Sequence, residues 1–503
     1  MTDFGECLKR LLLDGQWDIR TLAMRSGIPE KTLTGYVRGK GIPAQADFQR
    51  LLAALPLTVQ EQAQFSHSYY VSCVGEWTYH RRAFLKEQLS GLAQLEHLHH
   101  SDSFQTSMNP AGFRSLPEEG IRIFQGPFEV EKALYQSLSE ELCLQENPSV
   151  CTNAFLYQNT LRRILLGLYL SRGGRMELRH IIPFTKDTGS SLSNLVALFG
   201  ALSFCLAPGG AYRPSFYYSD APPYADSSAP FAFYLYTHNR LLWLSQDLET
   251  VALISNQELL KVYQERFERA AQFSRPLVYQ ARTAEEMIAA GHRFYNLEAP
   301  CQIFSMELQP CLGPFLTKDI LMRCVNHEEK GTDALAEQLN AYYDSVSPYL
   351  TCITSICWER GLNLFIDEGR LCAFPPAYAH AVSPQDRWEL LNRFYEKVLE
   401  GKVALYFVNE ALFPFSESFS LHCMDTEKAN IEVHDLSAQL YASIVLEEQS
   451  LCFAFSDFVR SMPEGEWTYS REASLEILRR GIARCQQIAG VQPGIACAPQ
   501  KAE

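Results

Sequence analysis

The chain has 503 residues, of which 47% are hydrophobic and 20% charged, and its formal net charge is −14. This length exceeds the roughly 300 residues that one hydrophobic core can serve, so several domains are expected, and the acidic balance excludes a protein that coats nucleic acid with its whole surface. Residues 1–50 hold eight Lys/Arg against six Asp/Glu, which is +2, so the remaining residues carry −16. A slightly basic head on an acidic body is typical of a chain in which only the head contacts nucleic acid.

The cysteines and the N-terminal residues indicate the cellular compartment in which the protein is expected. The fifteen cysteines form no Cys-x-x-Cys pair, which predicts free, mostly buried thiols in a reducing cytosol. The N-terminus lacks the pattern of a signal peptide, and the most apolar run, 164–170, is far shorter than the roughly 20 residues of a membrane span. We therefore expect a cytoplasmic protein with no membrane partner.

Metal binding is not favoured by the spacing of the candidate ligands. Cys352 and Cys357 form the closest cysteine pair, without a second pair nearby, which is poor spacing for zinc. His97, His99 and His100 lie in a polar segment that is more typical of a solvated turn. We expect neither a metal nor a cofactor.

Residues 4–65 are predicted to be helical, with two short helices meeting at a glycine between residues 18 and 40. Asp18 can cap the first of these helices, and Gly27 can adopt positive φ and end it. Apolar or small side chains would close a small core with the preceding helix. These scaffold positions are Leu22, Ala23, Gly27, Ile28, Leu33 and Tyr36.

This pattern resembles the helix-turn-helix of lambda-repressor-like (Cro-type) regulators, over roughly residues 4–65. Ser26 departs from the family, in which an aliphatic residue is usual. The resemblance implies that the second helix lies in the DNA major groove. It implies base contacts from Pro29, Glu30, Lys31, Thr34 and Gly35, and phosphate contacts near Ile19, Arg20, Arg38 and Lys40. Because Glu30 repels phosphate and Gly35 costs a helix about 1 kcal/mol, a hairpin that now binds protein is the alternative.

Residues 113–280 alternate between strands and helices, which predicts parallel βαβ units. The expected strands are 121–125, 149–155 and 177–183, the expected helices are 130–144, 160–170, 192–206 and 257–273, and a hairpin at 231–244 pairs with 251–254. Residues 207–230 read as a loop whose aromatic residues, from Tyr212 to Tyr224, could line a pocket or pack on the sheet.

The hairpin resembles, very weakly and over about residues 231–256, a degenerate phospholipase-D-like motif. That motif has the pattern His-x-Lys, four residues and Asp, followed by Gly-Ser-x-Asn, and here the positions hold His238, Arg240, Ser245 and Ser255-Asn256. The chemistry of such a motif needs two histidines, and no second copy is visible. We therefore expect no catalytic residues and no enzymatic activity. A fold that binds a ligand or pairs subunits is one interpretation, and a plain hairpin with a surface histidine is the other.

Residues 281–490 predict an α+β domain. Helices are expected at 283–296, 332–345 and 384–400, and strands at 351–357, 362–366, 371–374, 403–408, 419–423 and 444–446. No Gly-rich phosphate loop or Gly-x-Ser-x-Gly elbow occurs there.

A nine-residue segment recurs at 75–83 and 465–473, with seven identical positions. The simplest explanation is that the same residues lead into a helix in both places. The alternative is that Trp77 and Trp467 dock as a pair and couple the body to the head.

The sequence thus predicts a multidomain chain with an all-α helix-turn-helix head and α/β and α+β body domains. The predicted boundaries are 1–70 for the head, 71–112 for a helical connector and linker, 113–280 for a sensor domain, 281–490 for the C-terminal domain and 491–503 for a tail. The expected function is sequence-specific transcriptional regulation as a homodimer on double-stranded DNA, with a small-molecule or protein effector. The alternatives are a protein-interaction adaptor and a phosphodiester-processing enzyme with an accessory DNA-binding head.

Overall fold

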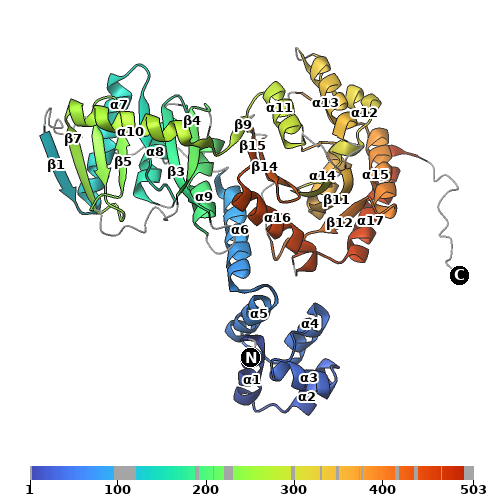
Figure 1. Cartoon of the computed structure of the whole chain (residues 1–503). Coiled ribbons are helices and arrows are strands. Elements are labelled where there is room, and N and C mark those ends of the chain that lie inside the picture. Colours follow the sequence, from blue (N-terminus) through green and yellow to red (C-terminus); the bar gives the residue numbers. More distant parts are fainter. Residues whose placement is uncertain are drawn as a thin grey trace. The chain divides into compact units, whose positions relative to one another are not determined.

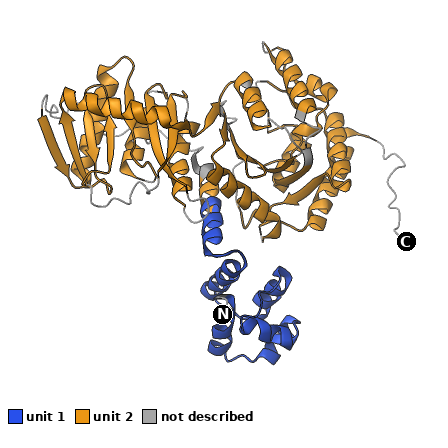
Figure 2. Cartoon of the chain, in the orientation of Figure 1, with its two compact units in different colours: residues 1–86 blue, residues 87–503 orange. Residues whose placement is uncertain are grey.

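The computed structural model describes residues 3–95, 120–157, 159–171, 173–186, 192–207, 209–219, 230–295, 301–328, 331–346, 350–372, 374, 378–413, 419–435, 440–465 and 467–491. The chain divides into two compact units, Met1–Lys86 and Glu87–Glu503 (Figure 2). A helical N-terminal region precedes a body with two mixed sheets (Figure 1). The predicted fold class, multidomain with a helical head and an α/β body, is confirmed. The histidines at 97–100 lie outside the described residues.

The N-terminal unit is built from helices that bury apolar side chains in one shared core. They are α1 (Asp3–Asp14), α2 (Ile19–Ser26), α3 (Glu30–Val37), α4 (Gln45–Ala54), α5 (Val59–Val74) and the first half of α6 (Glu76–Leu95). The core centres on aromatic rings, with Phe4 stacked on Phe65 at 5.1 Å and Phe48 stacked on Tyr69 at 3.8 Å between centroids. Such pairs add to the burial of apolar area that holds short helices together.

The first sheet of the body has eight strands in the order β1-β7-β6-β5-β2-β3-β4-β8. Its strands are β1 (Gly120–Gln125), β2 (Ser149–Thr152), β3 (Glu177–Thr185), β4 (Tyr212–Ser219), β5 (Phe233–Tyr236), β6 (Leu241–Leu244), β7 (Thr250–Ser255) and β8 (Arg275–Pro276). Its helices are α7 (Pro127–Leu144), α8 (Thr160–Ser171), α9 (Ser193–Leu206) and α10 (Gln257–Phe273). Strands β2 and β3 are parallel, as the βαβ pattern predicted, and β4 extends this parallel set. β1 was expected to be the first strand of these parallel units but pairs antiparallel with β7.

The second sheet has seven strands in the order β12-β11-β10-β13-β14-β15-β9. Its strands are β9 (Tyr279–Ala281), β10 (Cys301–Glu307), β11 (Leu350–Cys357), β12 (Val403–Phe407), β13 (Phe419–Met424), β14 (Lys428–Asp435) and β15 (Leu440–Leu446). Its helices are α11 (Ala284–Phe294), α12 (Lys318–Cys324), α13 (Thr332–Val346), α14 (Glu359–Glu368), α15 (Pro384–Leu399), α16 (Gln449–Ser461) and α17 (Arg471–Ala489).

The two sheets share one topology, which the sequence did not reveal. In each, three parallel strands (β2-β3-β4 or β10-β11-β12) are followed by three antiparallel strands that return along the other side (β5-β6-β7 or β13-β14-β15). An N-terminal strand, β1 or β9, closes the antiparallel edge in both. Helix α10 follows β7 as α16 follows β15. The body therefore contains two copies of one strand arrangement.

Three predicted segments were wrong. Residues 371–374 were expected to be a strand, but Leu371, Cys372 and Phe374 belong to none of the strands, and the Phe374 N–H donates to the Leu371 carbonyl at 3.1 Å in a turn. Residues 362–366 were expected to be a strand but belong to α14, because Leu362, Phe365 and Ile366 fall on one helical face and are all buried. The expected loop at 207–230 contains β4, where Tyr212 and Phe216 alternate with more exposed residues and β4 pairs in parallel with β3. Tyr212 is fully buried, which favours packing on the sheet over lining a pocket.

The repeated segment takes different conformations in its two places. Trp77 lies inside α6 and its residue is 60% exposed, whereas Trp467 precedes α17 and packs against Phe458 with the ring centroids 5.8 Å apart. The first copy is helical from residue 76 onward, whereas residues 467–470 of the second lie outside any helix and Thr468 forms a β-bridge with Val408. Neighbouring elements decide the conformation of so short a segment. None of the described helices is long and apolar enough to cross a membrane.

Candidate functional site

The turn between α2 and α3 has the local geometry that the sequence predicted. Asp18 caps α2 by accepting a hydrogen bond from the Thr21 N–H at 2.6 Å, and these contacts lower the pKa of its carboxyl. Gly27 ends the helix in the left-handed region with φ of 69°, where a side chain would be strained. Leu22, Ile28 and Leu33 are buried in one core. The two short helices are therefore fixed relative to each other by their own residues.

Ser26 has a structural role at the position where the resemblance expects an aliphatic residue. It is 6% exposed, and its hydroxyl donates to the Leu22 carbonyl at 2.7 Å. The same oxygen accepts from the Ile28 N–H at 3.3 Å. Both the hydroxyl and the turn amide are thus satisfied, which makes a serine acceptable in this core. Ala23 and Tyr36 pack at the edge of the same core, and Tyr36 donates to Asp47 at 3.1 Å.

The predicted DNA-contacting residues lie at the N-terminal end of α3 and at the flanks of the hairpin. Pro29 is the N-cap of α3. Thr34 donates to the Glu30 carbonyl at 2.8 Å, so its hydroxyl is engaged within its own helix. Exposed positions are Arg20, Pro29, Glu30, Lys31, Arg38 and Lys40, and half-buried positions are Ile19, Thr34 and Gly35.

His238 follows β5 and is held by a buried carboxylate. Its Nδ1 lies 2.5 Å from Oε1 of Glu141, whose side chain is 1% exposed, and its backbone N–H donates to Oε2 of the same carboxylate at 3.1 Å. The ring itself is 46% exposed. A carboxylate on Nδ1 orients the ring and leaves Nε2 directed away from that partner, as in histidine bases and nucleophiles.

The other positions of the hairpin motif have structural partners. Arg240 is bound to Glu140 at 2.9 Å and to Ser255. Ser245 accepts from the Thr250 N–H in the turn between β6 and β7, at 2.9 Å. Asn256 caps α10. In the second sheet, the turn between β13 and β14 holds residues 425–427, which include no histidine. The described residues therefore supply one candidate histidine at this topological position.

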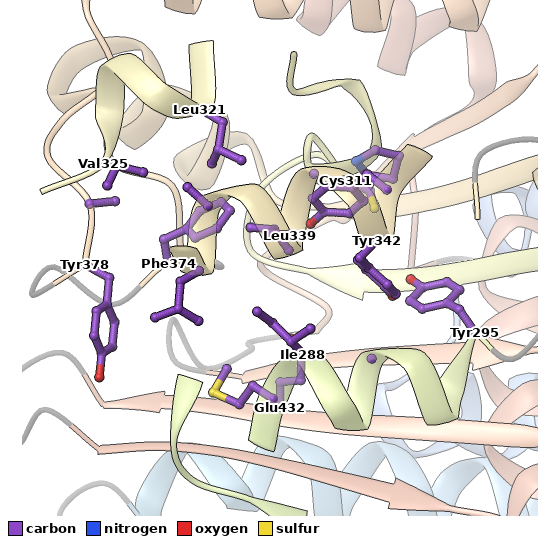
Figure 3. A pocket seen from close by; sticks show the side chains of 18 of the residues that line it. Ile288, Tyr295, Cys311, Leu321, Val325, Leu339, Tyr342, Phe374, Tyr378 and Glu432 are labelled. Carbon is purple, nitrogen blue, oxygen red and sulfur yellow. The ribbon is translucent and has the colours of Figure 1, made fainter. Parts of the chain in front are cut away.

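The second sheet bears a cavity of about 200 Å³ between its inner face, α11 and α13 (Figure 3). Apolar side chains of the helices, including Ile288 and Leu339, form one wall, and Phe374 and Tyr378 form another. Glu307 lies at the carboxyl end of β10, which is where α/β sheets usually bind ligands. Within the described part of the chain, no three His, Cys, Asp or Glu side chains gather closely enough to hold a metal ion.

The floor of this cavity is a set of polar side chains on neighbouring strands. Strand register places Glu307 opposite Ser420 and Ser420 opposite Glu432, in one row across β10, β13 and β14. The next row is Ser305, His422 and Asn430. All six point to the same face because side chains alternate along a strand. We call these six residues the polar floor, and Glu307, His422, Asn430 and Glu432 are its members that line the cavity.

Hydrogen bonds tie most of the polar floor together. Glu432 accepts from Asn430 at 2.8 Å and from Ser420 at 3.3 Å, and Glu307 accepts from Ser305. His422 is 9% exposed and its Nε2 lies 3.8 Å from Glu432, while its Nδ1 is buried and has no hydrogen-bond partner among the described residues. An unsatisfied buried ring nitrogen costs free energy.

Sequence reasoning missed the polar floor. Its signal in the sequence was a polar residue at every second position of an apolar strand. These pairs are Ser305 and Glu307, Ser420 and His422, and Asn430 and Glu432. Such alternation usually marks a strand with one solvent-facing side. Only the helices that cover this face turn it into a cavity.

No protein-family model matches the chain, and no curated protein matches it. Solved structures match with probability 1.00, among them phosphatidylserine synthase from Haemophilus influenzae Rd KW20, which is 9% identical, covers 75% of this chain and 96% of that chain, and has a TM-score of 0.25. TrmBL2, an archaeal chromatin protein, is 11% identical over 46% of this chain and 78% of its own, with a TM-score of 0.21. Polyphosphate kinase from Porphyromonas gingivalis is 10% identical over 73% and 56%, with a TM-score of 0.22.

At these TM-scores none of the likenesses assigns a function to this chain. None of the comparisons supports a Cro-type helix-turn-helix. The expectation of no enzymatic activity is contradicted, because two of these three structures are enzymes by name. That expectation is withdrawn.

Proposed function

We propose that the chain is a sequence-selective DNA-binding protein, a transcriptional regulator whose N-terminal unit contacts DNA through α3 and whose body binds a small molecule in the cavity above the polar floor. The observation that carries the proposal is the α2–α3 hairpin, in which a buried core fixes two short helices and leaves the N-terminal end of α3 exposed. Recognition helices read base edges from that end.

The charge around the hairpin supports the same function. Arg20, Lys31, Arg38 and Lys40 are exposed on or beside α2 and α3. Cations at such positions neutralise phosphates and release counterions, which gives salt-dependent affinity. Glu30 opposes phosphate but can accept from a cytosine amino group in the major groove. We therefore expect selectivity to depend on α3 and affinity to depend on its flanks.

The test is selection of bound DNA from a random pool with the full-length protein. An enriched motif is expected, and a palindromic one would indicate a homodimer with two half-sites. No enrichment at any salt concentration would contradict DNA binding and favour the protein-interaction adaptor. The boundaries predicted at 70, 112, 280 and 490 stay predictions that limited proteolysis can check.

Variants of the hairpin make the test specific. Lys31→Ala and Arg38→Ala should each weaken binding to the selected DNA and reduce the slope of log affinity against log salt by about one if the lost contact is to phosphate. Lys9→Ala is the matched control, since Lys9 is an exposed lysine on α1 of the same unit. An equal loss in the control would show that net charge, and not α3, governs binding.

A second function is favoured by the geometry of His238, namely phosphodiester processing. The buried Glu141 on Nδ1 orients an exposed imidazole, which is the arrangement of a histidine nucleophile or base. Because the chemistry needs a second histidine to act as acid, this function requires two copies of the chain to bring two His238 rings together.

This second function predicts turnover of a chromogenic phosphodiester such as bis(p-nitrophenyl) phosphate by the full-length protein. His238→Ala should lower the rate about 100-fold or more, and Glu141→Gln should lower it less. His80→Ala is the control, because His80 is an exposed histidine beside a glutamate, with Nε2 3.9 Å from Glu76. A rate that His238→Ala leaves unchanged would exclude catalysis by this residue.

A further inference from the structure

The lining of the cavity in the second sheet is mainly apolar and aromatic. Aliphatic side chains of α11, α12 and α13 contribute to it, and Figure 3 shows those of Ile288, Leu321 and Leu339 around one space. Its aromatic members are Tyr295, Tyr342, Tyr343, Phe374 and Tyr378. Apolar walls favour a ligand whose carbon surface is removed from water on binding. The cavity therefore selects for a carbon skeleton.

The volume of the cavity limits this skeleton to a single ring. The volume is about 200 Å³. An engineered apolar cavity of about 150 Å³ in another protein binds one benzene molecule. A ring with a few substituent atoms, or roughly eight to ten non-hydrogen atoms in all, matches the larger space here.

Three tyrosines, two on α13 and one at the end of α11, form a cluster against which a ring can pack. Tyr295 and Tyr342 meet edge to face with their ring centroids 5.5 Å apart, and Tyr343 lies 5.3 Å from Tyr342. Burial raises the pKa of Tyr295 and of Tyr342 well above its ordinary value, so both side chains stay neutral. Aromatic rings in contact attract each other beyond the effect of the buried area. The cluster therefore favours an aromatic ring over an aliphatic ring of the same size.

Glu307 gives the cavity a hydrogen-bond acceptor that a ligand can reach. Its side chain is half-buried, lines the cavity and lies at the carboxyl end of β10. Oε1 accepts a hydrogen bond from the Ser305 hydroxyl. Because a carboxylate has two oxygens and about four acceptor sites, Glu307 has the capacity to accept from a further donor. A ligand at this position therefore needs an O–H or N–H group, which an ionised carboxylic acid lacks.

The surroundings of Glu307 favour a donor without a full charge. Burial raises the pKa of Tyr343, and the nearby Glu307 adds to this rise, so the tyrosine cluster adjoins the carboxylate. Burying a full charge among apolar side chains costs far more free energy than burying a hydroxyl group. A hydroxyl group still forms a strong, charge-assisted hydrogen bond with a carboxylate. A hydroxyl group on an aromatic ring meets both conditions.

We propose that this cavity binds a small phenol, with its ring against the tyrosine cluster and the aliphatic side chains of α11 and α13, and with its hydroxyl group donating to Glu307. This inference rests on the proposed function and deepens it, since it names the chemical class of the effector. A phenol combines the three properties for which the lining selects, namely one aromatic ring, no net charge and one hydrogen-bond donor.

The test is calorimetric titration of the full-length protein with 4-methylphenol and three molecules of similar size. 4-Methylanisole lacks the donor, 4-methylcyclohexanol lacks the aromatic ring, and 4-methylbenzylamine carries a positive charge. Saturable binding of 4-methylphenol is expected, and each of the other three should bind about tenfold more weakly or not at all. No binding of 4-methylphenol at millimolar concentrations, or binding of any of the other three as tight as that of 4-methylphenol, would overturn the proposal.

A variant of Glu307 connects the affinity to the hydrogen bond. Glu307→Gln keeps the shape of the side chain and removes its charge, so it should weaken 4-methylphenol binding about tenfold. The weaker binding of 4-methylanisole should not change, because this molecule has no hydroxyl group to donate. Glu337→Gln, at an exposed position of α13, is the control with the same change of charge and should bind 4-methylphenol as the unmodified chain does. Unchanged affinity for 4-methylphenol in Glu307→Gln would overturn the proposal.

Two further variants locate the ligand in this cavity. Leu339→Trp and Ile288→Trp each place an indole in the space proposed for the phenol ring, from α13 and from α11, and each should abolish binding. Circular dichroism and urea denaturation identify which of the two variants is folded. Full affinity for 4-methylphenol in either folded variant would overturn the proposal.

The outcome can be distinguished from failure of the proposed regulator. Binding of 4-methylphenol without enrichment of any DNA would keep this ligand class and discard the regulatory function. Enrichment of DNA without binding of 4-methylphenol would keep the DNA-binding function and discard the phenol.

Discussion

The hairpins β5–β6 and β13–β14 occupy the same place in two sheets of the same strand order, yet their covered faces differ in kind. On the face away from α10, the first hairpin pairs Leu235 with Leu242, and both are fully buried. On the face away from α16, the second pairs His422 with Asn430. Strand order depends on connections and backbone pairing, so the covered face is free to be a dry core in one copy and a polar cavity in the other.

The contrast teaches where function can enter a duplicated fold. A dry face stabilises through apolar burial, at about 25 cal/mol per Å². A polar face lacks this stabilisation, and each of its buried polar groups needs a hydrogen-bond partner instead. In the second sheet, neighbouring hydroxyl and amide groups donate hydrogen bonds to Glu432 and Glu307. Nδ1 of His422 has no hydrogen-bond partner among the described residues. A face that is less stable than its counterpart is a better candidate for a binding site.

The largest effect should come from making the first hairpin resemble the second. Leu242→Asn places an amide directly opposite the apolar, fully buried Leu235. We expect a loss of about 4 kcal/mol, from lost apolar contacts and from a buried amide without partners. Urea denaturation followed by circular dichroism measures it. Asn430→Leu is the reciprocal change and should destabilise the fold less. A loss of unfolding free energy under about 1 kcal/mol in Leu242→Asn would contradict the contrast between the two hairpins.

A smaller effect is expected at the buried His180 as the pH falls. His180 on β3 is satisfied on both nitrogens: Nε2–H donates to the Ala154 carbonyl at 2.9 Å, and Nδ1 accepts from the Tyr212 hydroxyl at 2.8 Å. Burial lowers its pKa from 6.5 to about 4. Because the unfolded chain takes up this proton at higher pH, stability present above pH 6.5 is lost as the pH falls towards 4.

The size of this loss follows from the two pKa values. About 2 kcal/mol should be lost by pH 5. Denaturation midpoints at pH 7 and pH 5 should therefore fall further in the unmodified chain than in His180→Gln, which does not titrate. An equal fall in both would show that His180 is not the neutral buried group described above.

The smallest effect on stability is expected at His422. Replacing it by leucine removes the unsatisfied Nδ1 and adds apolar contact with the cavity wall. We expect the free energy of unfolding to change by no more than about 1 kcal/mol. Urea denaturation of this variant and of the unmodified chain measures the difference. A large destabilisation would show that His422 supports the fold itself, and the contrast between the two hairpins would then lose its functional meaning.

Much of the local structure could be predicted from the sequence. Asp18, Gly27 and the spacing of Leu22, Ile28 and Leu33 predicted the α2–α3 hairpin, because caps, turns and apolar periodicity act within a few residues. The limits of α10 were predicted to the residue, at Gln257 and Phe273.

The errors arose where distant segments decide the outcome. Residues 362–366 are helical because α14 buries one face in the core of the second sheet, with Gly361 against the Leu308 backbone. β4 is a strand because β3 provides its partner. The polar floor remained hidden, because alternation along a strand cannot show which of its two faces will be covered.

By itself, the sequence determined the helical head, the α/β alternation of the body, and the caps and turns that begin and end many elements. These features depend on propensity and periodicity over a few residues. Only the tertiary structure decided that the body contains two sheets of one strand arrangement, that His238 is held by the distant Glu141, and that four of the alternating polar residues line one cavity. Each of these brings together side chains that are far apart in the chain or on separate strands, and strand pairing and packing fix such neighbours only when the chain folds.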